Sequence, residues 1–298
     1  MQDDAHVEAA PSASGGLIRL QTRAGGLGSW LGPTWAMLCG VLASNAFDWQ
    51  GGDWLPLALL PLLVDAGWGT LWAALAGTDW AHAFRRWRTW QKNRPAVRLP
   101  YTLPGAPGDR ISRWLGRLSA WWQEVFWPAC GHAVRAAVIA VPLTALVATI
   151  LGPELLLLSV AALALMQLGV IWVSGRGVVP SGWDGLIAVA LPWLAGHSTF
   201  GAVTLPSAGL ATLFALAWGS AWHTTSGRAR IVLVVTQLLS GAFLIVLRRP
   251  LAAGMLFLLL LPQMVLLPWV RFDLPANRFV RHTRPWLMVA MTVAAIAL

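Results

Sequence analysis

Residues 127–173 read WPACGHAVRAAVIAVPLTALVATILGPELLLLSVAALALMQLGVIWV, two apolar runs that are separated by Gly152-Pro153-Glu154. A transmembrane helix needs about 20 consecutive, mostly apolar residues, and each run reaches that length. A transmembrane β-barrel would instead show alternating segments of about ten residues. The stretch therefore predicts two membrane-crossing helices that are joined by a tight turn.

The composition of the whole chain agrees with this prediction. Of its 298 residues, 57% are hydrophobic and 11% are charged, and the mean hydropathy is +0.63. Charged residues make up about 25% of a typical soluble domain. These values exclude a water-soluble enzyme, a disordered chain and a small disulfide scaffold. They predict an all-α, polytopic helical membrane protein.

Similar apolar runs on both sides bring the predicted count to about nine transmembrane helices. The predicted spans are 30–47, 54–77, 127–151, 154–173, 183–198, 207–223, 229–247, 251–270 and 285–298. Residues 1–27 are polar and lack the apolar core of a signal peptide, so we expect a flexible N-terminal tail. Residues 28–298 are then expected to form a single transmembrane helical domain.

The distribution of basic residues predicts how these helices are oriented. The chain has 21 basic and 12 acidic residues, which gives a net charge of +9. Many of the basic residues fall in a long loop at about 78–126, whereas the loops at 48–53 and 197–206 have none. This alternation, broken only by Arg248-Arg249, places the N-terminus in the cytoplasm. We therefore expect a protein of the bacterial cytoplasmic (inner) membrane, whose arginines face anionic lipid and no nucleic acid.

The long cytoplasmic loop contains a predicted surface helix at 110–126. Its arginines fall on one side, and its apolar residues recur at spacings of three and four on the other. The apolar positions are Ile111, Trp114, Leu115, Leu118, Trp121, Trp122 and Val125. This pattern is typical of an amphipathic helix that lies in the headgroup plane of a membrane.

Two ionisable residues lie inside predicted spans, where a charge is costly and is a functional candidate by default. Asp65 lies near the middle of the second span, where either a structural partner or a ligand would explain it. Arg135 lies about two turns into the third span and either reaches the headgroups or pairs with Asp65 or Asp79. A buried Asp65–Arg135 pair would suit a transporter of small molecules or lipids.

The sequence predicts no metal site and no resident cofactor. Cys39 and Cys130 form no C-x-x-C pattern. P-loop, G-x-G-x-x-G and G-x-S-x-G patterns are absent. Four histidines lie at predicted cytoplasmic helix ends but lack the close spacing of metal ligands: His82, His132, His223 and His282.

Two stretches of the chain resemble a known family. The first runs from Pro33-Thr-Trp-Ala-Met-Leu-Cys-Gly-Val-Leu-Ala43 to a helix end at Thr78-Asp79-Trp-Ala-His82. The second is Gly182-Trp-Asp-Gly-Leu-Ile-Ala-Val-Ala-Leu-Pro-Trp-Leu-Ala-Gly196, followed by Ala-Trp-His223-Thr-Thr-Ser-Gly227-Arg228. With nine spans and the longest cytoplasmic loop after the second, the layout resembles the UbiA family of intramembrane prenyltransferases. The resemblance implies a UbiA-like helical bundle.

The chemistry of that family needs two aspartate-rich motifs, of the N-D-x-x-D and D-x-x-x-D types, whose carboxylates hold Mg²⁺ against a diphosphate. Here the first motif retains only Asp79, and the second retains no carboxylate. The resemblance therefore implies the fold more than the activity, and no catalytic residue is assigned. The remaining candidates for binding a ligand or headgroup are Asp79, His82, Arg85, Arg86, His223, Arg228 and Arg230.

Several functions are compatible with these features. The first expectation is a protein that binds an isoprenoid, quinone or lipid-like ligand, or that acts in the assembly of a membrane complex, without Mg²⁺-diphosphate catalysis. One alternative is a divergent active prenyltransferase, which would use Mg²⁺ to move a polyprenyl group to an aromatic or lipid acceptor. Transport of a small molecule or lipid is the other.

Overall fold

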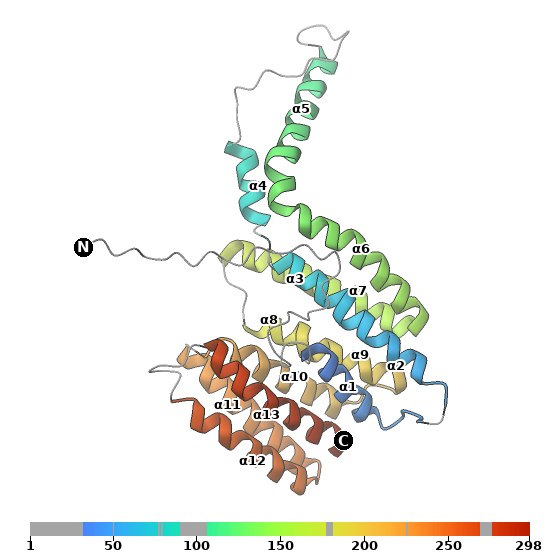
Figure 1. Cartoon of the computed structure of the whole chain (residues 1–298), viewed down its shortest axis with the longest axis vertical. Helices are drawn as coiled ribbons and strands as arrows, with labels where there is room; N and C mark the ends of the chain where they lie inside the picture. The colour runs from blue at the N-terminus through green and yellow to red at the C-terminus, as the bar shows by residue number, and fades with distance from the viewer. Residues whose placement is uncertain are drawn as a thin grey trace, which may run out of the picture.

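The computed structural model describes residues 32–49, 51–76, 78, 80–89, 106–176, 181–224, 226–268 and 276–298. Within these ranges every regular element is a helix, which confirms the predicted all-α class. The predicted tail at 1–27 lies outside the described residues. Figure 1 shows the elements, which are α1 (Gly32–Ser44), α2 (Trp54–Pro61), η1 (Leu62–Gly69), α3 (Thr70–Ala76), α4 (Trp80–Thr89), α5 (Pro107–Trp121), η2 (Trp122–Phe126), α6 (Trp127–Leu151), α7 (Pro153–Arg176), α8 (Ser181–Gly185), η3 (Leu186–Ala190), α9 (Leu191–Phe200), α10 (Leu205–Ala221), α11 (Gly227–Val246), α12 (Pro250–Leu266) and α13 (Ala276–Ala297).

Several of these elements join end to end into longer helices. The π-helical segment η1 connects α2 to α3, and η2 connects α5 to α6. Four helices in the described part of the chain are long and apolar enough to cross a membrane: Trp54–Ala76, Pro107–Leu151, Pro153–Trp172 and Gly227–Val246. The structure thus confirms crossing-length helices at four of the predicted spans.

Two of the other predicted spans differ from the helices in extent. The described helix α1 has 13 residues, about 20 Å, which is shorter than the roughly 30 Å hydrocarbon core of a bilayer. Helix α13 begins at Ala276, before the predicted start at 285, and it contains Pro285. A hydropathy pattern missed this start because the first turns of α13 carry arginines and are polar.

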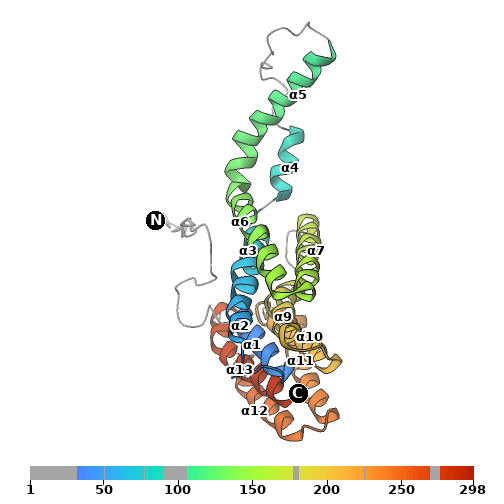
Figure 2. The same cartoon turned by 90° about the vertical axis from the view of Figure 1, so that its right-hand side faces the viewer.

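Most helices pack into a bundle, from which α4 and α5 project as an arm (Figures 1 and 2). The bundle has two large apolar cores. The first core joins α1 and α9 to α10, α11, α12 and α13. The second joins α1 and α9 to α2, η1, α3, α6 and α7. Because α1 and α9 contribute side chains to both cores, this pair of helices holds the two halves of the bundle together.

Two glycines allow α1 and α9 to approach each other closely. A Cβ atom on Gly40 of α1 would collide with the carbonyl oxygen of Trp193 on α9. A Cβ atom on Gly196 of α9 would collide with the carbonyl oxygen of Met37 on α1. Small residues at such positions let helix backbones pack at short range, which is the main source of helix association in membranes.

A buried chain of hydrogen bonds secures the other side of α9 against α10. Trp193 Nε1 donates to Ser207 Oγ at 2.9 Å, and Ser207 Oγ lies 3.0 Å from His197 Nδ1. His197 Nε2 lies 3.0 Å from the carbonyl oxygen of Ala202. A carbonyl can only accept, so Nε2 carries the imidazole proton and Nδ1 accepts from the serine. Every polar group in this buried chain is therefore satisfied.

An aromatic cluster attaches the arm to the bundle. Ala83 and Trp87 of α4 pack against Trp121 and Phe126 at the junction of α5 with α6. The ring centroids of Trp87 and Trp121 are 5.4 Å apart in an edge-to-face arrangement. Arg117 on α5 lies over the Trp87 ring at 5.1 Å. These contacts cover the part of the α5 apolar stripe that is nearest the bundle.

The predicted surface helix at 110–126 is continuous with α6. The combined helix Pro107–Leu151 has 45 residues, about 67 Å at 1.5 Å per residue. This is about twice the hydrocarbon thickness of a bilayer, so α5 extends beyond the part that can cross. The position of α5 in a headgroup layer stays a prediction.

Replacing either glycine of the α1–α9 contact by alanine will destabilise the fold. We expect Gly40→Ala and Gly196→Ala to lower the free energy of unfolding by about 1–3 kcal/mol each, because the added methyl group overpacks a backbone contact. Thermal unfolding in detergent, followed by circular dichroism, measures this change. Gly254→Ala is the matched control, since nothing lies within 4 Å of its Cβ position. Equal melting temperatures for all three variants would contradict the prediction.

Ser207→Ala will also destabilise the bundle. It removes a partner from both the Trp193 N–H group and His197 Nδ1, and each unpaired buried polar group costs about 1–3 kcal/mol. Ser198→Ala is the control, because the Ser198 hydroxyl bonds only the carbonyl of Ala195 in its own helix, at 3.3 Å. The prediction fails if the two variants unfold at the same temperature.

Candidate functional site

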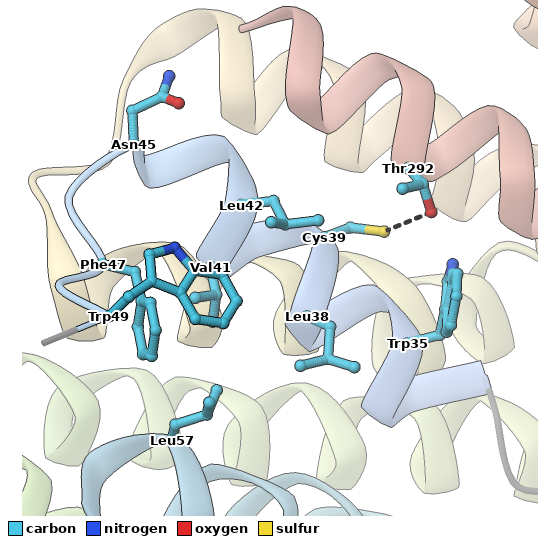
Figure 3. A pocket seen from close by; sticks show the side chains of 10 residues that line it. All are labelled: Trp35, Leu38, Cys39, Val41, Leu42, Asn45, Phe47, Trp49, Leu57 and Thr292. Carbon is cyan, nitrogen blue, oxygen red and sulfur yellow. Dashed lines mark hydrogen bonds between the residues drawn. The ribbon is translucent and has the colours of Figure 1, made fainter. Parts of the chain in front are cut away.

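An apolar groove lies along the side of α1, between α13 and the start of α2 (Figure 3). It encloses about 350 Å³. Phe47 and Trp49, from the loop that joins α1 to α2, lie at one end of it, and Trp35 lies at the other. We call this space the α1 groove. Its lining residues are Trp35, Leu38, Cys39, Val41, Leu42, Asn45, Phe47, Trp49, Leu57 and Thr292.

Most polar groups in the wall of the α1 groove already bond one another. Thr292 Oγ1 donates to the carbonyl oxygen of Met288 at 3.1 Å, so the Cys39 thiol, 3.8 Å away, donates to Thr292. Trp35 Nε1 donates to the same Met288 carbonyl at 3.0 Å. Among the described residues, none that lines the groove is charged. The wall is therefore suited to an uncharged, apolar molecule.

Four aromatic rings gather at the loop end of the groove. Phe47 lies at the centre, with ring centroids 4.9 Å from Trp49, 5.5 Å from Trp54 and 5.2 Å from Phe200, all edge to face. Trp54 Nε1 donates to the Trp49 carbonyl oxygen at 3.3 Å. Edge-to-face pairs are a favourable geometry for aromatic rings, so this cluster holds the loop against α9.

A polar contact links three helices at the opposite end of the bundle. We call this the basic end; α8 and α11 begin there, and α3 and α10 end there. Trp72 Nε1 of α3 donates to Asp184 Oδ1 of α8 at 3.1 Å, and Asp184 interacts electrostatically with His223, just beyond α10. Sequence reasoning did not select Asp184. The sequence feature that could have identified it is its isolation, because Asp184 is the one acidic residue between Glu154 and Asp273.

A second bond at the basic end holds Thr78, just beyond the end of α3. Thr78 Oγ1 donates to the Ala74 carbonyl oxygen at 2.8 Å and lies 3.3 Å from His132 Nε2 on α6. Because the threonine proton is already used, the histidine donates to the threonine oxygen. Asp79 lies outside the described residues, as does the side chain of His82.

The arginine candidates do not converge on one site. Arg85 and Arg86 are exposed on α4, within the projecting arm. Arg228 and Arg230 lie in the first turn of α11 in the bundle, where Arg228 is exposed and Arg230 is half-buried. Figures 1 and 2 both show the arm separated from α11. The structure therefore does not form an arginine clamp from these four residues.

The two candidates inside predicted spans, Asp65 and Arg135, have different surroundings. Asp65 is buried in the π-helical segment η1. Arg135 is exposed on α6, with its guanidinium 5.3 Å from the Trp127 ring centroid. This placement differs from an Asp65–Arg135 pair, which was one of the alternatives predicted for Arg135: the side chain runs back along α6, where the indole face attracts the cation.

A further arginine, which sequence reasoning did not select, lies close to two indole rings. The Arg284 guanidinium on α13 lies 5.1 Å from the Trp218 ring and 5.4 Å from the Trp222 ring of α10. Both contacts are within the range of a cation–π interaction. These two contacts fix the polar start of α13 against the end of α10.

Among the described residues, no group of three or more His, Cys, Asp or Glu side chains could hold a metal ion. Comparisons of the chain with protein-family models, with curated proteins and with solved structures find no match.

Proposed function

We propose that this chain is an integral membrane protein that binds an isoprenoid, a quinone or a similar lipid-like molecule in the α1 groove. The observation that carries the proposal is the groove itself, which has aliphatic and aromatic walls and, within the described part of the chain, no charged lining residue. Pockets for small ligands are concave, mostly apolar and few in number. The Cys39 thiol and the Thr292 hydroxyl in its wall are already bonded, so the part of the groove along α1 offers a ligand mainly dispersion contacts.

The nine-span arrangement, with a cytoplasmic N-terminus, belongs to the same proposal. Helix ends that the charge pattern assigns to one side of the membrane do lie together. Trp72 near the end of α3 bonds Asp184 near the start of α8. On the other side, Phe47 after α1 contacts Phe200 at the end of α9. These contacts support alternate crossings of the chain.

The proposal does not include Mg²⁺-diphosphate catalysis, because the carboxylates for it are too few. Mg²⁺ and a diphosphate need several anionic oxygens from the protein at one place. Asp184 is the acid that the structure adds at the basic end, and it already accepts a bond from Trp72. The donor set therefore does not fit the metal site that the UbiA resemblance implies. A UbiA-like origin of the bundle remains part of the proposal.

A role in the assembly of a membrane complex is the second candidate, and the arm favours it. Helix α4 covers only part of the apolar stripe on α5. Ile111, Trp114 and Leu115 remain 59%, 55% and 48% exposed. Arginines border them, of which Arg113 pairs with Asp109 at 2.8 Å. A projecting surface of this kind suits contact with another subunit or with lipid.

Filling the α1 groove will weaken ligand binding. Leu42→Trp places a large ring in the groove, and we expect the Kd for farnesol, used as the probe, to rise about tenfold, the effect of about 1.4 kcal/mol. Native mass spectrometry of the whole chain in nanodiscs measures bound farnesol against a titration. Lipids extracted from protein purified from its own membrane then identify the natural occupant.

Leu146→Trp is the control, because Leu146 is a 60% exposed leucine on α6, outside the groove. It should bind farnesol like the wild type. If Leu42→Trp also binds like the wild type, or if the extracted lipid is bulk phospholipid alone, the groove is a lipid-filled surface and the proposal fails. Co-purified protein subunits without such a ligand would favour the assembly role.

A further inference from the structure

We infer that the α1 groove selects a ligand with an uncharged planar ring at its head, with this ring seated against Trp49 at the loop end and the apolar chain lying along α1. This inference rests on the proposed function and adds the orientation and the head chemistry of the ligand. It follows from three features of the groove: its direction, its aromatic end and the charge of its mouth.

The lining residues of α1 define a straight track. Trp35, Leu38 and Leu42 follow one another at spacings of three and four, so they lie on one face of the helix, and Asn45 comes directly after the helix end at Ser44. From Trp35 to Leu42 this face is about 10 Å long at 1.5 Å per residue. Its middle is aliphatic, with Leu57 of α2 opposite (Figure 3). A flexible apolar chain fits this part, whereas a rigid ring system would leave much of it empty.

The loop end offers a ring surface instead of an aliphatic one. The Trp49 side chain lines the groove and is 67% exposed. Its contacts with Phe47 and Trp54 are edge to face, at interplanar angles of 80° and 68°. Contacts of this type leave much of the indole surface open for an offset-stacked planar ring. The backbone below it is held by the Trp54 Nε1 bond to the Trp49 carbonyl, so the ring surface is preorganised.

The mouth of the groove disfavours an anionic head. The loop at 45–53 contains Asp48 and Asp53 and no basic residue. The Asp48 backbone N–H donates to Asp53 Oδ2 at 2.9 Å, which holds both acids at the loop end. A diphosphate placed beside Trp49 would meet the negative charge of this loop, and none of the described residues that line the groove is an arginine or a lysine. A quinone ring carries no charge, and its flat face matches the indole.

Three probes that share a farnesyl group but differ in the head separate these features: 2-farnesyl-1,4-benzoquinone, farnesol and farnesyl diphosphate. Binding to the protein in nanodiscs is measured by native mass spectrometry, and the Kd of each probe for the wild type is compared with its Kd for Leu42→Trp. We expect the quinone to bind about two- to tenfold more tightly than farnesol, which is the range for an aromatic pair. Farnesyl diphosphate should bind more weakly than farnesol.

Variants at Trp49 test where the ring lies. Trp49→Leu should abolish the preference for the quinone over farnesol while leaving the Kd for farnesol within about twofold of the wild type. Trp49→Phe should restore part of the preference, because it returns a flat ring. Trp114→Leu, at an exposed tryptophan of the arm, is the matched control and should leave the preference unchanged. Melting temperatures show whether each variant is folded.

The possible outcomes distinguish this inference from the proposed function. If the quinone and farnesol bind equally to the wild type, or if Trp49→Leu weakens both to the same extent, the ring does not lie on Trp49. If the diphosphate binds most tightly, the head is not neutral. Both results overturn the inference but leave the groove as a chain-binding site. If none of the probes binds above the level of Leu42→Trp, the proposed function itself fails.

Discussion

The close contact of α1 with α9 is the interaction on which the rest of the bundle depends. Gly40 and Gly196 bring the two backbones together without intervening side chains. Met37 and Val41 then point into one core, while Ala36 and Cys39 point into the other. Since α1 has only 13 described residues, a widening of this contact would loosen both cores together. Packing at short range replaces the hydrophobic driving force, which is weak between helices inside a bilayer.

The same contact determines where a groove can exist. With one side of α1 against α9, a second side carries Leu38 and Leu42, each 36% exposed, toward the space between α13 and α2. Thr292 closes one wall through its contact with Cys39, a residue more than two hundred positions earlier in the chain. The groove thus results from the packing of one side of α1 against α9, and its apolar walls follow from the apolar residues of α1.

Sequence reasoning predicted the features that depend on local composition. The apolar runs at 127–151 and 154–173 correspond to α6 and α7, because length and hydropathy alone decide such helices. It could not find the α1 groove, because that space is made by α1, a loop and α13, which are distant in sequence. It also passed over Asp184, whose role depends on Trp72 approaching it from α3. The start of α13 was missed because polar first turns conceal a helix from a hydropathy pattern.

The helix that includes α5 and α6 belongs both to the arm and to the bundle, and this has a mechanical consequence. No loop separates the tip of α5 from Thr144 of α6, whose hydroxyl lies against Gly67 of η1. A force applied to the arm, by lipid or by another subunit, therefore reaches the centre of the bundle along a single rod. The π-helical segment η2 is the point along that rod where the hydrogen-bond pattern changes, and bends in long helices often occur at such turns. The aromatic cluster packs around this segment, so it braces the rod at the one place where its hydrogen-bond pattern changes.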